Sequence, residues 1–185
     1  MQHCNIYYCL KEKDEKPDAY VRKLLEYGFE DSFSIPYREE EILRGECGKP
    51  LSVREGVCFN ISHGHRMVAL ACAKVPVGID VESPRKVLEN AMKKSCSHKE
   101  WEWLLRSENR QEDFLRLWTL KESYVKMLGT GLRMDPAKVE VMGSDLEGFL
   151  LQYDLEEGYL SVCLDHTEKD WRKEDIYLKK MSFTV

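Results

Sequence analysis

The sequence predicts an α+β fold, because its patterns run from strands to helices and back to strands instead of alternating between the two. Short apolar runs open the chain, and a helical pattern fills its middle. Glycine-punctuated apolar runs close it. At 185 residues, with 43% hydrophobic and 33% charged residues, the chain suits one domain or two small halves that share a core.

The first part of the chain predicts a strand, a helix, a turn and a meander. The helix covers residues 18–27, with Asp18 as its N-cap and Gly28 directly after its end. Gly48-Lys49-Pro50 follows a polar stretch and indicates a turn. A meander of three strands comes next. The strands of this part cover 6–10, 57–62, 67–73 and 77–81.

The second part predicts helices followed by strands. Ser97 and Glu100 have the spacing of a capping box, which predicts the start of a helix. A longer helix covers residues 112–128 and ends at Gly129. The closing strands cover 139–142, 149–155 and 159–164, with turns at 145–148 and 156–158.

Composition and charge argue against several classes of protein. A net charge of −5 and a pI near 5.6 disfavour general nucleic-acid binding, so local cations must hold any phosphate-bearing ligand. No apolar run approaches the roughly 20 residues that span a bilayer, and we expect no secretory signal. The seven cysteines are scattered without a C-x-x-C pair, which favours a reduced, cytoplasmic protein.

Residues 77–82 place two carboxylates on one face of a strand. Side chains two residues apart point the same way, so Gly78, Asp80 and Glu82 share a face. Gly78 lets a ligand or a backbone approach closely there. Carboxylate oxygens are hard ligands of the kind that Mg²⁺ prefers. The alternative is a solvated strand face, and two acids on a strand do not decide between the two interpretations.

The long helix carries a third acid and two lysines. Glu122 and Lys126 are i,i+4 neighbours nearly opposite its apolar stripe, and Lys121 adjoins them in sequence. Apolar residues extend beyond the stripe, so charges buried on this helix require partners. A surface ion pair is the alternative. Combined with Asp80 and Glu82, these residues indicate a site for a divalent cation that holds a phosphate-rich ligand.

A hydroxyl and an imidazole, those of Ser62 and His63, stand at the end of a predicted strand. Both can donate hydrogen bonds to phosphate, the imidazole when protonated or in a suitable tautomer. The alternative is a turn whose side chains bond the local backbone. No G-x-S-x-G elbow surrounds Ser62, so a serine hydrolase is not indicated.

Four motifs, taken in order, resemble those of the 4′-phosphopantetheinyl transferases, in particular the larger, pseudo-twofold, monomeric type. The pairing of G-I-D-V-E with W-x-x-K-E-S-x-x-K about forty residues later is specific, and the clear resemblance covers residues 48–132. The motifs are Gly48-Lys49-Pro50, Phe59-Asn60-Ile61-Ser62-His63, Gly78-Ile79-Asp80-Val81-Glu82 and Trp118-Thr119-Leu120-Lys121-Glu122-Ser123-Tyr124-Val125-Lys126.

The resemblance implies two similar α/β halves related by a pseudo-twofold, approximately residues 1–83 and 84–185, with coenzyme A in the cleft between them. Enzymes of this family transfer the 4′-phosphopantetheine arm of coenzyme A to a serine of an apo acyl or peptidyl carrier protein and release 3′,5′-ADP. Such carriers serve fatty-acid, polyketide or nonribosomal-peptide synthesis. We therefore expect a cytoplasmic monomer whose partners are the carrier and coenzyme A, without nucleic acid or membrane.

The resemblance also implies catalytic and metal-binding roles for residues of the motifs. Asp80, Glu82 and Glu122 would bind Mg²⁺, with Mn²⁺ as a possible substitute. Glu122, Lys126 and His63 are the catalytic candidates, with Glu122 as a hypothetical base for the carrier serine.

Further residues are implied to contact coenzyme A. Those that would face its phosphates are Ser62, His63, Lys121 and Lys126, and those that would lie against its adenosine are Gly48, Lys49 and Pro50. Larger family members carry a longer basic N-terminal region that helps hold the 3′-phosphate. In this chain we expect Arg22 and Lys23 to replace that region.

Two other hypotheses belong to different classes. The first is a non-catalytic module that binds coenzyme A or a carrier protein, although a pure binder does not need three metal-binding acids. The second is another Mg²⁺-dependent nucleotide enzyme, such as a hydrolase, which would form its product without a carrier.

Overall fold

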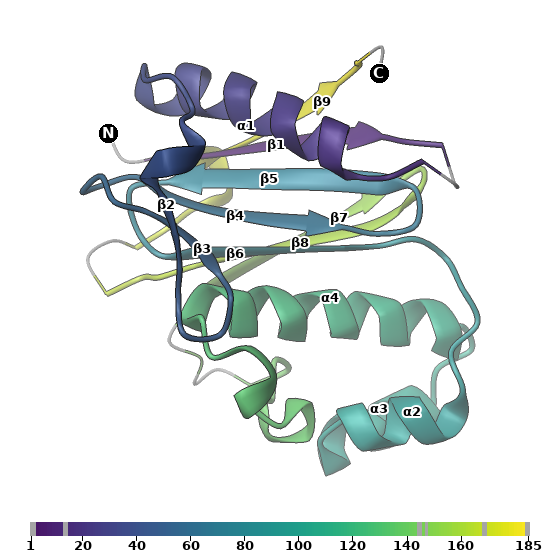
Figure 1. Ribbon diagram of the computed structural model, residues 1–185. Helices are drawn as coiled ribbons and strands as arrows, with labels where there is room; N and C mark the ends of the chain where they lie inside the picture. Colours follow the sequence, from purple (N-terminus) through teal and green to yellow (C-terminus); the bar gives the residue numbers. More distant parts are fainter. Residues whose placement is uncertain (1–2, 13–14, 144–145, 147, 168–169, 184–185) are drawn as a thin grey trace.

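The computed structural model describes residues 3–12, 15–143, 146, 148–167 and 170–183. It confirms the α+β class, with two sheets stacked between α1 on one side and α4 on the other (Figure 1). The helices are α1 (Asp18–Phe33), α2 (Glu89–Ser95), α3 (His98–Leu105) and α4 (Arg110–Leu128). The strands are β1 (Cys4–Leu10), β2 (Ile42–Arg44), β3 (Pro50–Ser52), β4 (Cys58–His63), β5 (Met67–Ala73), β6 (Val77–Glu82), β7 (Phe149–Leu155), β8 (Gly158–Leu164) and β9 (Ile176–Met181).

The two halves share one topology, which confirms the expectation of two similar halves. In the first half, β1 is followed by α1 and then by β4 and β5, which form a sheet in the order β4-β5-β1. In the second half, β6 is followed by α4 and then by β7 and β8, in the order β7-β8-β6. All four strand pairs in these two sets are antiparallel.

The strand β6 corrects the expected meander. It pairs with β8, with Ile79 opposite Val162, instead of continuing the sheet of β4 and β5. The apolar alternation of a strand does not say which partner it pairs with, and this partner lies about 80 residues further along the chain. Because β6 opens the second sheet, the halves divide at residues 74–76 and not at residue 83.

The last strand was not predicted. β9 pairs in parallel with β1, with Cys4 opposite Ile176, and becomes the fourth strand of the first sheet. Two consecutive lysines, Lys179 and Lys180, weaken its apolar signal. The chain thus returns to its first half after completing the second.

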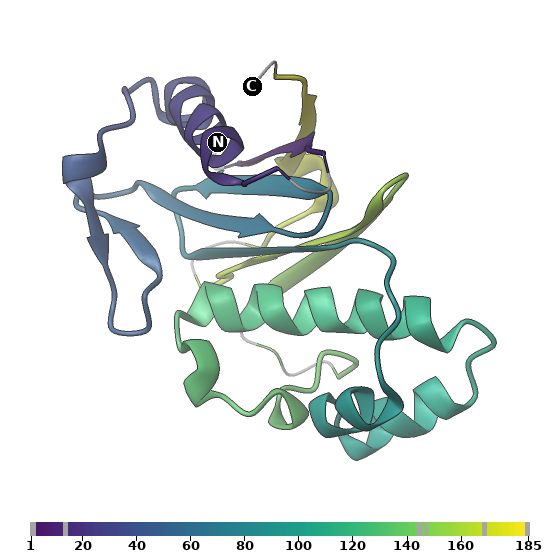
Figure 2. The same cartoon turned by 45° about the vertical axis from the view of Figure 1, so that its right-hand side comes forward.

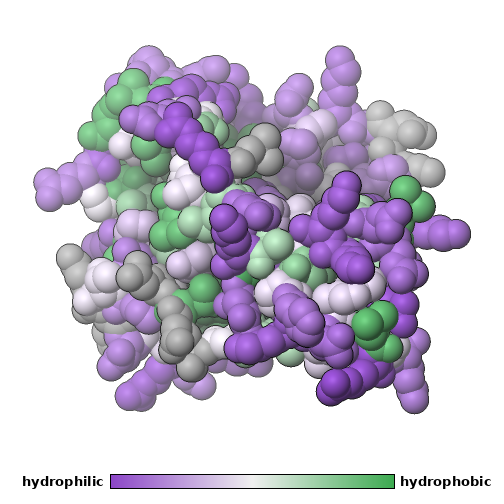
Figure 3. All heavy atoms as spheres, turned by 90° about the horizontal axis from the view of Figure 1, so that it is seen from below, coloured by the Kyte–Doolittle hydropathy of each residue, from purple (hydrophilic) through white to green (hydrophobic). Residues whose placement is uncertain are grey.

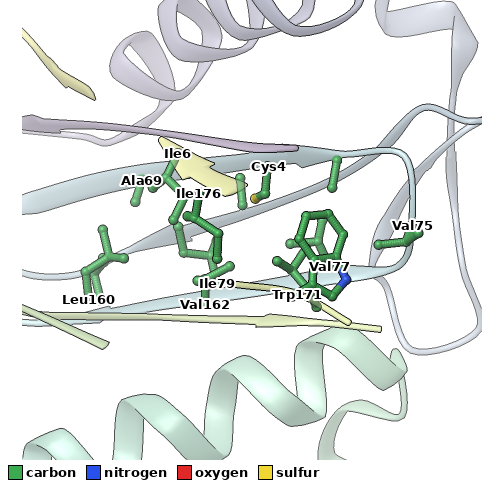
Figure 4. Close-up of a cluster of buried hydrophobic side chains, with 14 of the residues drawn as sticks. Cys4, Ile6, Ala69, Val75, Val77, Ile79, Leu160, Val162, Trp171 and Ile176 are labelled. Carbon is green, nitrogen blue, oxygen red and sulfur yellow. The ribbon is translucent and has the colours of Figure 1, made fainter. Parts of the chain in front are cut away.

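A shared hydrophobic core lies between the two sheets (Figure 4). It joins Ile6 of β1 and Ala69 of β5 to Ile79 of β6 and Leu160 and Val162 of β8, all of them fully buried. A second cluster packs α1 against the outer face of the first sheet, and a third packs α3 against α4. Because one cluster contains residues of both sheets, the halves depend on each other for burial.

The first helix is longer than expected. α1 continues past Gly28 to Phe33 and ends at Ser34, whose φ of 56° is left-handed. Gly28 is therefore not a C-terminal glycine. A Cβ at this position would lie 2.5 Å from Leu70 Cδ2 and 3.1 Å from Tyr7 Cε2, so the glycine allows the helix to pack closely on β1 and β5.

The helices of the second half follow the predicted signals. Ser97 and Glu100 form the capping box of α3, and α4 ends at Gly129, whose φ is 71°. The predicted strand at 139–142 is absent. A 3₁₀ helix, Pro136–Lys138, leads into this segment, which is fixed by side chains of α3 and α4. The predicted turn at 145–148 lies largely outside the described residues.

The side of the molecule that carries α2, α3 and α4 has a mainly hydrophilic surface, with smaller hydrophobic areas (Figure 3). Trp103 and Leu105 of α3 are 39% and 42% exposed. Among the described residues, no helix combines the length and the apolar character needed to cross a bilayer.

Candidate functional site

The strand β6 and the helix α4 are in direct backbone contact at Gly78. A Cβ at this position would lie 2.0 Å from the carbonyl oxygen of Ser123 and 2.3 Å from the backbone nitrogen of Met127. The close approach expected at Gly78 is therefore made by a helix backbone. Any other residue at position 78 would push β6 away from α4. Asp80 of the strand would then be separated from Lys126 of the helix.

Ser62 of β4, Asp80 of β6 and Lys126 of α4 meet in one hydrogen-bonded group. Lys126 Nζ lies 2.6 Å from Asp80 Oδ1 and 3.0 Å from Ser62 Oγ. Ser62 Oγ donates to Asp80 Oδ1 at 2.8 Å and accepts from the backbone nitrogen of Val81 at 3.3 Å. The three residues come from both halves, so the group joins β4, β6 and α4 at the junction between the two halves.

Burial raises the pKa of two acids of this site, Asp80 and Glu122, and neighbouring carboxylates add to both shifts. Burial raises the pKa of Asp80, while the Lys126 ammonium opposes the shift and Glu82 adds to it. Burial also raises the pKa of Glu122, with further contributions from Asp80 and Glu82 against the effect of Lys126. The acids of β6 and α4 are therefore close enough to interact electrostatically, and additional positive charge would stabilise the ionised forms of Asp80 and Glu122.

Cationic side chains neutralise two of these acids. Arg85 holds both oxygens of Glu82, at 3.0 Å from Nε and 2.9 Å from Nη2, while Lys126 holds Asp80. Within the described ranges, no three His, Cys, Asp or Glu side chains are arranged as a metal-binding group. The expected convergence of three ligands is not formed. The donor set still fits Mg²⁺, because it consists of mutually repelling carboxylates with hard oxygen atoms.

Asn60 belongs to one of the four motifs, but no role in the site was predicted for it from the sequence. Its Oδ1 accepts from the backbone nitrogen of Ile79 at 2.9 Å. β6 is an edge strand, and the Asn60 and Ser62 side chains satisfy two N–H groups on its open edge. The signal was present, because residues 60 and 62 share one face of β4. Which edge they would cover depended on the placement of the second half.

The hairpin β2–β3 closes one side of the junction (Figure 2). Its tip reaches the C-terminal end of α4, where Cys47 Sγ donates to the carbonyl oxygen of Thr130 at 3.1 Å. A cavity of about 240 Å³ lies between the hairpin, β4 and α4. Its lining includes Gly48, Lys49, Pro50, Asn60 and Lys126. The expected Gly-Lys-Pro contact region therefore faces the cleft between the halves.

A larger cavity lies on another side of the same hairpin. It measures about 530 Å³, has a mostly apolar lining, and shares Lys49, Pro50 and Gly129 with the smaller cavity. The Lys49 side chain donates from Nζ to the carbonyl oxygens of Val77 at 3.0 Å and Met127 at 3.2 Å. Burial lowers the pKa of Lys49 to about 8. Lys49 thus ties the hairpin to β6 and α4.

Lys121 does not lie where the sequence analysis expected it. It is 1% exposed and pairs with the fully buried Glu100, with Nζ 2.5 Å from Oε2. Nζ also donates to the carbonyl oxygens of Pro136 at 2.8 Å and Val139 at 2.5 Å. The Glu100 carboxylate accepts from the backbone nitrogen of Val141 at 3.2 Å. This lysine therefore anchors the segment after α4 and faces α3, not the acids of β6.

The three remaining candidates differ in whether they line a cavity. His63 lines a third cavity, of about 400 Å³, together with Arg44 and Pro50 of the hairpin. Arg22 is exposed and forms an ion pair with Glu26 at 3.0 Å. Lys23 lies over the ring of Phe183, 5.9 Å from its centroid. Neither Arg22 nor Lys23 lines any of the three cavities.

Comparison with known proteins assigns the family. The model of the "4'-phosphopantetheinyl transferase superfamily" matches residues 76–178, which is more than half of the chain. The matched region begins directly before β6 and contains Asp80, Glu82, Glu122 and Lys126. The chain belongs to this superfamily.

Curated relatives carry the same description. The chain is 36% identical over 101 residues to 4′-phosphopantetheinyl transferase gsp of Aneurinibacillus migulanus, with 54% of this chain and 42% of the relative covered. It is 30% identical to L-aminoadipate-semialdehyde dehydrogenase-phosphopantetheinyl transferase of Mus musculus, with 89% and 57% covered. It is 30% identical to 4′-phosphopantetheinyl transferase Sfp of Bacillus subtilis, with 60% and 56% covered. The chain thus spans about half the length of these relatives.

Proposed function

We propose that this protein transfers the 4′-phosphopantetheine arm of coenzyme A to a serine of an apo acyl or peptidyl carrier protein and releases 3′,5′-ADP. The observation that carries the proposal is the meeting of Ser62, Asp80 and Lys126 beside a cavity between the halves. Membership of the superfamily supports the same reaction. In this proposal the diphosphate of coenzyme A lies against Lys126 and Ser62.

Asp80, Glu82 and Glu122 would hold a Mg²⁺ ion, or Mn²⁺ in its place. When bound, the ion supplies positive charge that stabilises the phosphates and the leaving group. The raised pKa values of Asp80 and Glu122 support a cation at this position, since it would relieve the repulsion between them. The residues that neutralise these acids in the structure, Lys126 and Arg85, would then be free to move towards the substrate.

The chain's own residues would position the substrate and move one proton. Lys126 would neutralise the charge that develops on the bridging oxygen as 3′,5′-ADP leaves. Glu122 would accept the proton of the carrier serine, directly or through water. Its raised pKa makes it a better proton acceptor than an ordinary surface carboxylate. The hypothesis is rejected if Glu122→Gln keeps turnover and an unchanged pH profile.

The other contacts follow the position of the cavities. Gly48, Lys49 and Pro50 would lie against the adenosine, because they line the cavity that also contains Lys126. His63 would contact a phosphate from the neighbouring cavity. Arg22 and Lys23 remain our proposal for the 3′-phosphate, although both side chains have other partners in the structure.

The proposal includes a cytoplasmic monomer that acts on carriers of fatty-acid, polyketide or nonribosomal-peptide synthesis. Seven free cysteines support a reducing compartment. The net charge of −5 and the coenzyme A substrate argue against nucleic acid as a partner.

Intact-mass spectrometry tests the reaction. A panel of apo carriers is incubated with the protein, coenzyme A and Mg²⁺, with a chelator in a parallel sample. We expect one carrier class to gain the mass of one phosphopantetheine group, and the chelator to abolish the gain. Lys126→Gln should reduce the rate at least about 100-fold through loss of transition-state charge stabilisation, while the exposed Lys94→Gln should not.

Each other outcome points to a different function. Binding of coenzyme A without modification of any carrier would indicate a binding module. Release of an ADP product in the absence of carrier would indicate a hydrolase. No binding of coenzyme A would reject the proposed function itself.

A further inference from the structure

A buried polar group joins α4 to β7 and β8, the strands behind β6 in the second sheet (Figure 1). Gln152 Nε2 of β7 lies 2.8 Å from the carbonyl oxygen of Arg116, 2.8 Å from Ser161 Oγ and 3.0 Å from Thr119 Oγ1. The hydroxyl oxygens of Thr119 and Ser161 are 2.8 Å apart, and both residues are fully buried. Three side chains from one helix and two strands therefore meet at one point.

The donors and acceptors of this group can be assigned from its carbonyl. A carbonyl oxygen only accepts, so the carboxamide atom that faces Arg116 is the nitrogen of Gln152. Thr119 Oγ1 donates to the same carbonyl at 2.9 Å and consequently accepts from the hydroxyl of Ser161. Turning α4 about its axis would break these bonds and leave buried polar atoms without partners. The group therefore holds α4 in one orientation.

The group lies beside one of the acids of the site. Ser161 is directly opposite Asp80 in the register of β8 and β6, so the two side chains point to the same face of the sheet. α4 crosses this face, with Thr119 bonded to Ser161 and Lys126 bonded to Asp80. One helix is thus attached to two adjacent strands through side chains seven residues, or about two turns, apart. Together these attachments fix its rotation.

Glu122 and Lys126 occupy nearly the same face of α4 as Thr119. At about 100° per residue, Glu122 lies about 60° and Lys126 about 20° around the helix from Thr119. Side chains reach about 5–6 Å from the helix axis, so a rotation of about 10° moves their ends by about 1 Å. A misplacement of about 1 Å can reduce an enzymatic rate about a hundredfold. The rotation of α4 therefore decides whether its acid and its lysine meet β6 correctly.

We propose that Thr119, Gln152 and Ser161 are positioning residues, which set the rotation of α4 at which Glu122 and Lys126 face the acids of β6. Stability alone does not require a polar group here, because apolar side chains of the same shape would fill the space without polar atoms to satisfy. Hydrogen bonds, unlike apolar contacts, specify a direction. The inference rests on the proposed function, since it concerns the geometry of that reaction.

The first test needs no ligand. Thr119→Val keeps the shape and removes the hydroxyl, and Lys126→Met removes the ammonium that holds Asp80. Residues 119 and 126 are about 10 Å apart along the helix and their described hydrogen bonds share no partner, so independent sites would change the unfolding equilibrium constant multiplicatively. If Thr119 places Lys126, the double variant should deviate from the product by at least about twofold in urea denaturation.

A parallel cycle provides the control. Ser32 Oγ belongs to a different hydrogen-bonded group, with Asn5 and Tyr7 of β1. Ser32→Ala removes this hydroxyl far from α4, and its effect should multiply with that of Lys126→Met. A multiplicative result for Thr119→Val as well would overturn the inference.

The second test measures the reaction on fully folded protein. Thr119→Val should lower kcat for carrier modification at least about tenfold through misplacement of Glu122 and Lys126, whereas Thr119→Ser, which keeps the hydroxyl, should retain most of it. Ser32→Ala should keep the wild-type kcat. Equal kcat values for Thr119→Val and wild type would overturn the inference.

The two proposals fail in different ways. Wild-type protein that modifies no carrier rejects the proposed function, and with it the catalytic role of the group. Wild-type protein that modifies a carrier, together with a multiplicative Thr119 cycle, rejects the positioning role alone.

Discussion

Lys121 and Lys126 belong to one motif, yet they serve different parts of the molecule. At 3.6 residues per turn, five positions rotate a side chain by about 140° around the helix, whereas the four positions from Glu122 to Lys126 return it to nearly the same face. Lys126 accordingly faces Asp80, while Lys121 faces Glu100. The family motif places the two lysines close in sequence, and the helix geometry separates them.

We expect the buried pair of Lys121 and Glu100 to act on stability and not on ligand binding. Lys121→Met leaves the Glu100 carboxylate buried without its cation, so the free energy of unfolding should fall by about 3–5 kcal/mol. Urea denaturation measures this change. The double variant Lys121→Met/Glu100→Gln should lose less than the sum of the single variants. A folded Lys121→Met protein that binds coenzyme A much more weakly than wild type would contradict this assignment.

Lys49 gives a prediction about pH. Its pKa is lowered to about 8 by burial, whereas a lysine in an unfolded chain titrates near about 10.4. Between these values the unfolded state binds more protons, so stability increases with pH. Below about pH 8 the ammonium is charged in both states, and the burial penalty is fully present.

The measurement is the free energy of unfolding of wild type relative to Lys49→Met, from about pH 8 to about pH 10.5. We expect this difference to shift in favour of wild type as pH rises. The exposed Lys74→Met serves as the control and should show no such trend. A flat or opposite trend for Lys49 would show that its ammonium is not destabilised by burial.

At the scale of elements, the site depends on β6, which belongs to the second sheet and is also hydrogen-bonded by side chains of the first sheet. β6 pairs through its backbone with β8, and its open edge is satisfied by side chains of β4. The backbone of α4 packs against a face of β6 at Gly78. Strand, strand and helix are thus held at hydrogen-bond or van der Waals distance, which keeps Asp80 against Lys126.

The contact at Gly78 can be tested by adding one methyl group. Gly78→Ala should push α4 away from β6, lower the free energy of unfolding by about 3 kcal/mol or more, and reduce coenzyme A binding. Urea denaturation and calorimetry check the two effects. Gly143→Ala is the matched control, since its nearest neighbour would be 4.0 Å away. Wild-type stability in Gly78→Ala would mean that the helix is not packed on the strand as described.

At the scale of the whole molecule, the two halves share a core and should unfold together. Ile6 and Ala69 of the first sheet belong to the same buried cluster as Ile79 and Leu160 of the second. Neither half can lose its structure without exposing apolar surface of the other.

Leu24→Ala tests this cooperativity, because Leu24 is 1% exposed and belongs to the cluster under α1. The substitution should cost about 2–5 kcal/mol. Hydrogen exchange should show the same loss of protection for the core amides of β5 and of β8. The control Leu43→Ala, at a residue 59% exposed, should change neither strand. Protection that falls in β5 and stays in β8 would show that the halves unfold independently.

The sequence by itself determined the local elements and the chemistry of the site. The alternation of β6, the capping box at Ser97 and the glycine after α4 are local signals, and the structure follows each of them. The acids and the lysine were identified for the same reason, since their types and spacing within one element are visible in the chain.

Only the tertiary structure decided which element pairs with which. β6 leaves the expected meander, β9 joins β1, and Gly28, expected after the end of the first helix, lies inside it, because each outcome depends on partners far away in sequence. The roles of Asn60 and Lys121 depend on the same long-range packing. The residue type determines which hydrogen bonds a side chain can make. The packing of both halves around one core determines which partner the side chain finds.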